Sequence, residues 1–171
     1  MARSRGLRDI KDACSVLEYL IHDLIVGPQL YDIFVDISKQ TNVKPETERA
    51  VRRMYVSYVI LTLSKLSEFL GHYKSLIPGT LRHRCTALER ELVRRKVRKL
   101  RNTFVGHIHN KDTRRPVDEA ELDAAFNAAT DNDLEAFLRW VFVPGNVNAP
   151  NTVVGVLEAM HANLRAQLPK P

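Results

Sequence analysis

The stretch of sequence that decides the fold runs from Pro45 to Tyr73 and reads PETERAVRRMYVSYVILTLSKLSEFLGHY. Its apolar side chains recur every three or four residues, which is the spacing of one face of an α-helix. One stripe comprises Val51, Tyr55, Tyr58, Thr62, Leu66, Phe69 and Tyr73, and a second beside it holds Met54, Val59, Leu63 and Leu70. An apolar face this wide predicts a central helix, opened by Pro45, that packs against neighbours on more than one side.

Helical spacing continues upstream of this segment. Apolar residues from Ile10 to Leu24 predict a helix that ends at Gly27, a natural C-terminal cap. Pro28 can then open a short second helix, because a first-turn proline loses no intrahelical hydrogen bond. We therefore expect two helices before the polar loop that precedes Pro45.

Downstream, Pro78-Gly79 break the chain before a long basic helix expected over about 81–106. Accessory helices follow over about 118–168, the first capped by Asp118 and the next by Asp131 or Asp133. No sustained alternation predicts a β-strand. Residues 1–171 should thus form a single all-α domain, a helical bundle whose long central antiparallel pair is the helix opened by Pro45 and the helix over 81–106.

The charge is concentrated in one segment. The chain of 171 residues carries 26 Lys and Arg against 20 Asp and Glu, a formal net charge of +6. Residues 81–115 hold twelve basic and three acidic side chains, a local balance of +9, so the remainder sums to −3. This pattern is typical of a protein that binds a polyanion, although a solvated basic helix face would produce it too.

Composition excludes several classes. A hydrophobic fraction of 44% with 27% charged residues is that of a globular protein and excludes a disordered or fibrous chain. Cys14 and Cys85 lie in apolar helical registers, so we expect small buried residues of a reducing compartment and no disulfide framework. Because neither a signal peptide nor a membrane span is evident, we expect a cytoplasmic protein with no membrane partner.

Common catalytic motifs are missing. The sequence contains no phosphate-binding loop, dinucleotide fingerprint, HExxH or GxSxG. His107 and His109 form a lone His-x-His without a supporting carboxylate or Cys, so we expect no metal and no other cofactor. His72 is interpreted as a structural or surface residue, and Tyr55, Tyr58, Tyr73 and Trp140 as core residues.

The end of the basic helix carries the one suggestive group, Arg101, Asn102 and His107. In an unbroken helix Arg101 and His107 would point about 120° apart, but Gly106 can end the helix and free the imidazole to turn back. An arginine holds a phosphate bidentately, and a histidine exchanges a proton near neutral pH. Asn102 adds an amide that can orient either group, so the three could promote attack of a ribose 2′-hydroxyl on a phosphodiester without a metal.

Arg101-Asn102-x-x-x-x-His107 resembles the signature of HEPN domains, in which an Arg and a polar residue precede a His by a few positions. The segment from Leu63 to Phe69 is similar to the helix that precedes the motif helix in HEPN proteins of the abortive-infection kind, and the resemblance covers about residues 45–125. It implies a helical bundle, often a homodimer whose motifs converge in a composite cleft. It also implies a metal-independent endoribonuclease of a toxin–antitoxin or phage-defence system, with an antitoxin protein as possible partner.

Carried over, the resemblance implies that Arg101 stabilises the phosphate, His107 acts as general base or acid, and Asn102 positions the scissile group. Glu68 is either an accessory carboxylate that orients these residues or an exposed glutamate. RNA backbone contacts are expected from Lys99 and from Arg94 and Arg98, which would share one helix face with Arg101.

Two other functions stay open. One is a catalytically inactive HEPN-like module that binds RNA or nucleotide, or regulates, through the same residues. The other is an unrelated helical protein that binds DNA, which the long helices beside Pro78-Gly79 disfavour because helix-turn-helix readers use a short recognition helix.

Overall fold

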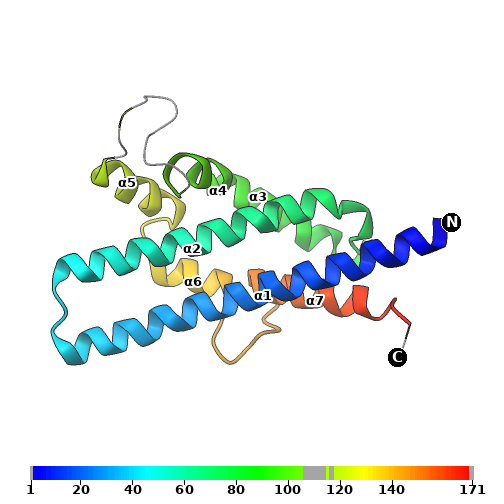
Figure 1. The fold of residues 1–171 in the computed structure, drawn as a ribbon, viewed down its shortest axis with the longest axis horizontal. Helices are drawn as coiled ribbons and strands as arrows, with labels where there is room; N and C mark the ends of the chain where they lie inside the picture. Colours follow the sequence, from blue (N-terminus) through cyan, green and yellow to red (C-terminus); the bar gives the residue numbers. More distant parts are fainter. Residues whose placement is uncertain (1, 106–114, 116–117, 170–171) are drawn as a thin grey trace.

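The structure, a computed structural model, describes residues 2–105, 115 and 118–169. Within these ranges the chain forms helices and turns, with a single isolated β-bridge between Val143 and Asn146. The predicted all-α helical bundle is therefore confirmed (Figure 1). The helices are α1 (Ala2–Thr41), α2 (Pro45–His72), α3 (Arg82–Arg94), α4 (Val97–Leu100), α5 (Glu119–Ala129), α6 (Leu134–Val141) and α7 (Val153–Arg165).

The two longest helices, α1 and α2, run antiparallel as a hairpin (Figure 1). The break expected at Gly27-Pro28 is wrong, because α1 continues through both residues. A β-carbon on Gly27 would lie 3.3 Å from the Tyr58 ring, so the missing side chain lets α1 approach α2 closely. Beyond the proline, the rings of Tyr31 and Tyr55 stack at 4.7 Å. Packing against α2 therefore outweighs the hydrogen bond that Pro28 cannot donate.

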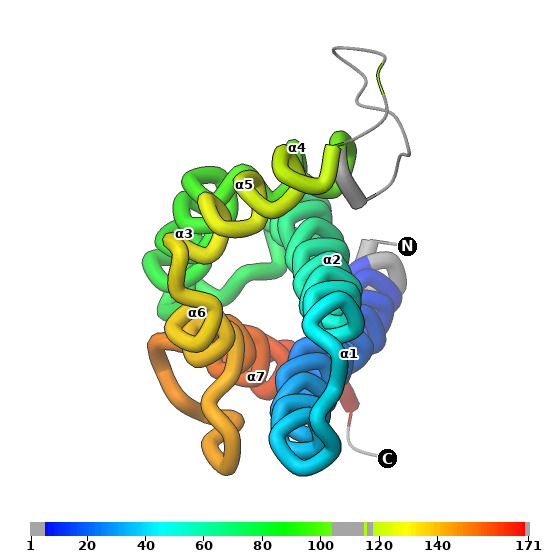
Figure 2. Tube along the Cα trace, turned by 90° about the vertical axis from the view of Figure 1, so that its left-hand side faces the viewer, coloured from blue at the N-terminus to red at the C-terminus, as the bar shows by residue number. Residues whose placement is uncertain are grey.

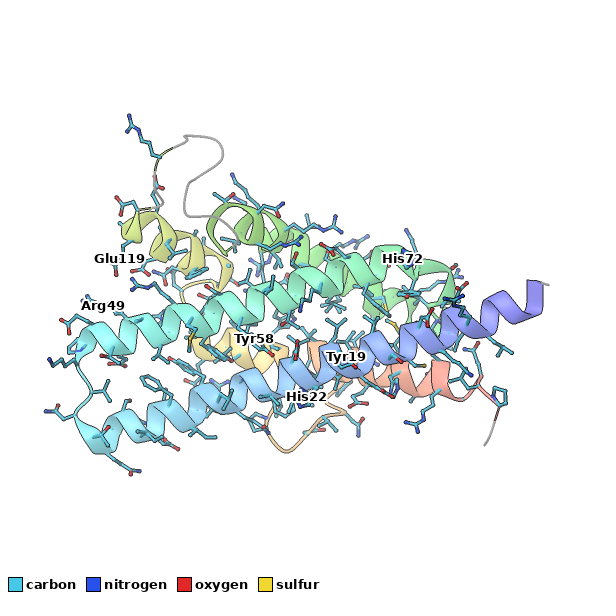
Figure 3. All side chains as sticks on the ribbon, in the orientation of Figure 1. Tyr19, His22, Arg49, Tyr58, His72 and Glu119 are labelled. Atoms are coloured by element: carbon cyan, nitrogen blue, oxygen red, sulfur yellow. The ribbon has the colours of Figure 1, made fainter. Side chains whose placement is uncertain are left out.

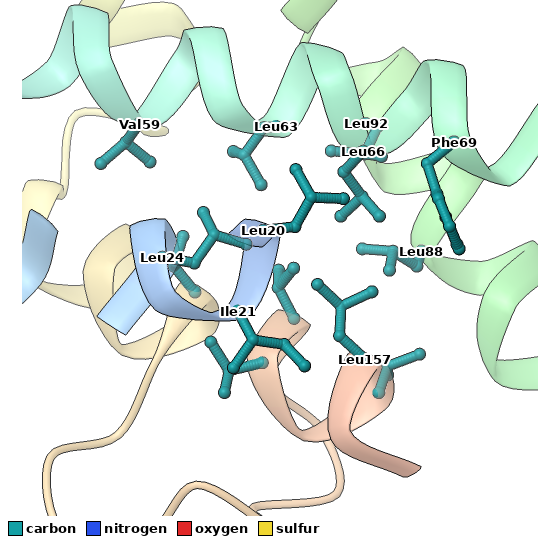
Figure 4. Packing of buried hydrophobic residues seen from close by; sticks show 14 of the residues in the cluster. Leu20, Ile21, Leu24, Val59, Leu63, Leu66, Phe69, Leu88, Leu92 and Leu157 are labelled. Atoms are coloured by element: carbon teal, nitrogen blue, oxygen red, sulfur yellow. The ribbon is translucent and has the colours of Figure 1, made fainter. Parts of the chain in front are cut away.

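The expected central pair is therefore wrong in one member. The long helix that pairs with α2 is α1, and not the basic helix expected over 81–106. Seen along the hairpin, α3, α6 and α7 lie on one side of α1 and α2 (Figure 2). The core is built between them from Leu20, Ile21 and Leu24 of α1, Val59, Leu63 and Leu66 of α2 and Leu157 of α7, and Ile21 lies on the α7 side of α1 (Figure 4). Contacts of α2 with α1, α3 and α4 confirm that its wide apolar face packs on more than one side.

The helix expected over 81–106 is not continuous. It begins as a short 3₁₀ turn at Gly79–Leu81, continues as α3, and stops at Arg95 and Lys96, where Lys96 adopts the left-handed conformation with φ of 54°. After α4 the chain forms a π-helical turn over Arg101–Val105. The break lies where Arg95 turns inward and is buried between Glu91, Asp131 and two aromatic rings.

Local capping signals are confirmed in the C-terminal helices. The Asp118 carboxylate accepts a hydrogen bond from the Ala120 amide at the start of α5, and Asp133 accepts from Ala136 at the start of α6. Thr152 caps α7 in the same way through the Gly155 amide. Cys14 and Cys85 are both buried, as predicted, and burial raises the pKa of the Cys85 thiol to about 11. Across the described ranges, no helix has the length and apolar character that crossing a bilayer requires.

Candidate functional site

Arg101 lies at the first position of the π-helical turn, and its side chain reaches across to α2. Its guanidinium donates a hydrogen bond to the Glu68 carboxylate at 2.8 Å. The two side chains are 42% and 54% exposed, so this ion pair is a surface contact that adds little to stability, about 0–1 kcal/mol. The contact instead gives the exposed guanidinium a defined position, with Glu68 as the residue that orients it.

The π-helical turn sets the surroundings of this pair. Within it, Asn102 is exposed and Thr103 is buried. π-Helical turns are rare, and they are frequently found at functional sites. His107 lies outside the described residues, so its place beside Arg101 stays a prediction. Of the predicted site residues, the structure brings Arg101 and Glu68 into contact, and Asn102 follows Arg101 as an exposed residue of the turn.

The basic residues expected to flank Arg101 have separate surroundings. Arg94 forms ion pairs with Glu91 at 2.6 Å and with Asp131 at 2.7 Å. The hydrogen bond from Arg94 lowers the pKa of Asp131 to about 2. Arg98 donates to the Ser67 carbonyl at 3.4 Å. Because the chain is broken at Lys96, the unbroken helix on which a common face of Arg94, Arg98 and Arg101 was predicted does not exist.

Lys99 is exposed on α4. Within the described ranges of the chain it makes no ion pair and no side-chain hydrogen bond, and Arg98 has no carboxylate within 4 Å. Among the described residues, Arg98 and Lys99 therefore lie next to Arg101 without a carboxylate partner and are available to an anion.

A groove on the outer face of the hairpin adjoins Glu68, and sequence reasoning missed it. We call it the aromatic groove; it has a volume of about 510 Å³ and is lined mainly by Tyr19 and Asp23 of α1 and by Lys65, Glu68, His72 and Tyr73 at the end of α2. Figure 3 shows Tyr19 and His72 on the two helices. Tyr19 is 74% exposed. Tyr73 was expected in the core but is only partly buried. No sequence signal pointed to the groove, because Tyr19 and His72 lie on different helices.

A second hollow lies between α2 and α5, at the opposite end of α2. Three arginines at i, i+3 and i+4, Arg49, Arg52 and Arg53, line it together with Asp123 and Asn127, around a volume of about 110 Å³. Arg53 pairs with Glu119. The spacing of the arginines was visible in the sequence, but the residues of α5 that complete the hollow were not.

Arg95 lies in the basic segment and has a structural role that sequence reasoning missed. Its side chain is 8% exposed, donates to the Ala129 carbonyl and lies over Trp140 at 4.8 Å and Phe137 at 5.2 Å. It is therefore a structural cation that ties α3 to α5 and α6. Of the other tyrosines expected in the core, Tyr55 is buried and Tyr58 is 39% exposed. In the described ranges no group of three or more His, Cys, Asp or Glu side chains is placed to hold a metal ion.

Comparison with known proteins identifies the fold and no family. No family model and no curated protein matches the sequence. Among solved structures, the chain is similar to an integron cassette protein, Vpc_cass2, from the mobile metagenome of V. paracholerae. The two chains are 22% identical, the TM-score is 0.76, and the match covers 91% of this chain and 95% of the other. At this identity the similarity establishes a shared helical architecture, which is the conclusion that the comparisons allow.

Proposed function

We propose that this protein is a metal-independent endoribonuclease that uses Arg101, Asn102 and His107 on an RNA phosphodiester. The observation that carries the proposal is the position of Arg101. Its exposed guanidinium lies at a π-helical turn, is oriented by Glu68 and is followed by an exposed Asn102. The resemblance of Arg101-Asn102-x-x-x-x-His107 to HEPN motifs supplies His107 and the reaction class.

In the proposed reaction, Arg101 binds a non-bridging phosphate oxygen and stabilises the charge that develops on it. His107 takes the proton of the ribose 2′-hydroxyl, and the 2′-oxygen attacks phosphorus. The bond from phosphorus to the 5′-oxygen of the next nucleotide breaks, and that oxygen receives the proton that His107 had taken. The products are a 2′,3′-cyclic phosphate end and a 5′-hydroxyl end, and Asn102 positions the phosphate through its amide.

Glu68 has a defined role in this scheme. A carboxylate 2.8 Å from the guanidinium holds the Arg101 side chain against the end of α2. Arginine offers five N–H donors, so a phosphate can bind Arg101 while Glu68 keeps one of them. Arg98 and Lys99 add positive charge beside the phosphate path. The family resemblance adds a homodimer with a composite cleft and an antitoxin that restrains the enzyme, and both belong to the proposal.

The test is incubation of purified protein with total RNA in EDTA, with Arg101→Ala and His107→Ala in parallel. Arg82→Ala is the matched control, because Arg82 is an exposed arginine of α3 with no ion pair in the ranges of the chain that the structure describes. We expect cleavage with 2′,3′-cyclic phosphate ends by wild type and Arg82→Ala, and none by the other two.

Two outcomes contradict this function. Intact RNA together with salt-sensitive RNA binding that Arg101→Ala weakens would replace the nuclease with a binding module. Cleavage that survives both Arg101→Ala and His107→Ala would remove these residues from the reaction. Light scattering of the purified protein checks the dimer separately.

A further inference from the structure

The rings of the aromatic groove are fixed in place by contacts with one another, unlike those of a random surface depression. Tyr73 packs on Phe69 at 4.9 Å between centroids, and the His72 ring meets Tyr73 edge-on at 4.6 Å. Tyr19 faces the same groove from α1 and is 74% exposed. Figure 3 shows Tyr19 on α1 and His72 on α2, the two helices whose side chains line the groove. The groove therefore offers a fixed aromatic surface to a planar ligand.

The charged residues of the groove select against an anion inside it. Asp23 and Glu68 both line it, against the single cation of Lys65. Carboxylates only accept hydrogen bonds, so a ligand group that enters the groove should carry N–H donors and no negative charge. Among the described residues, Asp23 has no Lys or Arg within 4 Å, and the His22 ring lies 3.9 Å from its carboxylate. Asp23 also faces Tyr58, whose pKa burial and the Asp23 carboxylate raise to about 12.

Glu68 connects the groove to the candidate site. The same carboxylate lines the groove and binds the Arg101 guanidinium at 2.8 Å. A ligand that fills the groove and contacts Arg101 must thus combine a neutral, aromatic, donor-bearing group with an anionic group that lies a single side chain away. A nucleotide of single-stranded RNA has this chemistry, with a base that stacks on aromatic rings and a phosphate that binds arginine.

We infer that the aromatic groove binds the base of the nucleotide whose phosphate lies on Arg101, and that it prefers guanine. The inference rests on the proposed function and names the substrate feature that the site recognises. Guanine presents two adjacent donors, N1–H and N2–H, that match one carboxylate, and Asp23 is the carboxylate without an arginine partner among the described residues. Uracil presents one donor between two carbonyl oxygens, which the carboxylates of the groove repel.

The inference is tested by fluorescence anisotropy with labelled RNA pentamers made uncleavable by 2′-O-methylation, UUGUU against UUUUU. We expect UUGUU to bind more tightly to wild type. Tyr19→Ala should weaken that binding about fivefold or more, the loss typical of one base–aromatic stack. Tyr19→Phe keeps the ring and should bind as wild type. Asp23→Asn should abolish the preference for guanine over uracil while binding of UUUUU persists.

Leu30→Ala is the matched control, since Leu30 is 59% exposed on the same helix and does not line the groove. Unchanged RNA binding by Tyr19→Ala, with weakened binding by Arg101→Ala, overturns the groove and leaves the proposed function standing. If neither variant changes RNA binding, both the groove and the proposed function are wrong. A Tyr19→Ala variant that loses only self-association, with RNA binding intact, overturns the inference and assigns the groove to contact with a second copy.

Discussion

Arg94 and Arg95 are neighbours in sequence, contact the same two carboxylates and differ in burial, which makes them a matched pair. Both form ion pairs with Glu91 and Asp131. The Arg94 side chain is 49% exposed and the Arg95 side chain is 8% exposed. If burial decides what a cation contributes, Arg95→Ala and Arg94→Ala must differ strongly in the free energy of unfolding.

The magnitude for Arg95 follows from its surroundings. Its guanidinium lies over two rings, at 4.8 Å from Trp140 and 5.2 Å from Phe137, and desolvated cation–π contacts contribute about 1–2 kcal/mol. Its hydrogen bond to the buried Ala129 carbonyl is charge-assisted and contributes about 1.5–3 kcal/mol. Because such terms are not additive, we expect Arg95→Ala to lose about 2–4 kcal/mol. Arg94→Ala should lose less than about 1 kcal/mol, because solvent screens its exposed pairs.

The assay is urea unfolding followed by far-UV circular dichroism at neutral pH, with the slope of free energy against urea compared between variants. Arg95→Lys is a second check: it keeps the charge but lacks the planar group that stacks on both rings, so it should recover only some of the loss. Equal losses for Arg94→Ala and Arg95→Ala, or a loss below about 1 kcal/mol for Arg95→Ala, would refute the reasoning from burial.

Three further outcomes are expected. Gly155→Ala should destabilise the fold by about 2 kcal/mol or more, because its β-carbon would lie 1.9 Å from the Ala149 carbonyl oxygen. Gly71→Ala adds a methyl group in open space on α2 and should stabilise the fold by up to about 1 kcal/mol. Thermal denaturation of both variants checks this. The Asp131 pKa of about 2 lies below its ordinary value of 3.8, so the stability linked to this carboxylate is present above about pH 4 and is lost as pH falls toward 2. In Asp131→Asn the free energy of unfolding should change less with pH over this range. Cys85, buried and with a thiol pKa raised to about 11, should react with a thiol reagent only after unfolding, and fast reaction in native buffer would contradict its burial.

The local features of the fold could be predicted because their causes are local. The apolar stripes of residues 45–73 make a helix in any context that buries them, and Pro45 begins that helix as expected. Asp118 and Asp133 cap helices through amides two and three residues ahead. The break at Gly27-Pro28 was predicted by the same local logic and is wrong, because the contact of Gly27 with Tyr58 belongs to another helix.

Some residues of the candidate site could likewise be predicted from the sequence, and others depend on tertiary packing. Arg101 and Asn102 could be singled out from their spacing to His107 and from the basic segment around them. Glu68 stood open between an accessory and an exposed residue, and its pairing with Arg101 depends on how α2 and the π-helical turn lie side by side. The aromatic groove was invisible because Tyr19 and His72 belong to different helices and line one groove only across the hairpin.

By itself, therefore, the sequence determined the helical class, the starts of α2, α5 and α6, and the positive charge of residues 81–115, since each follows from spacing, capping or composition along the chain. Only the tertiary structure decided that α1 runs unbroken to Thr41, that the basic helix breaks at Lys96 around a buried Arg95, and that Arg101 meets Glu68. The physical reason is that a helix can be continued, broken or turned by a few kcal/mol of packing and buried charge. Those contacts come from residues that are distant in sequence and close only in the folded chain.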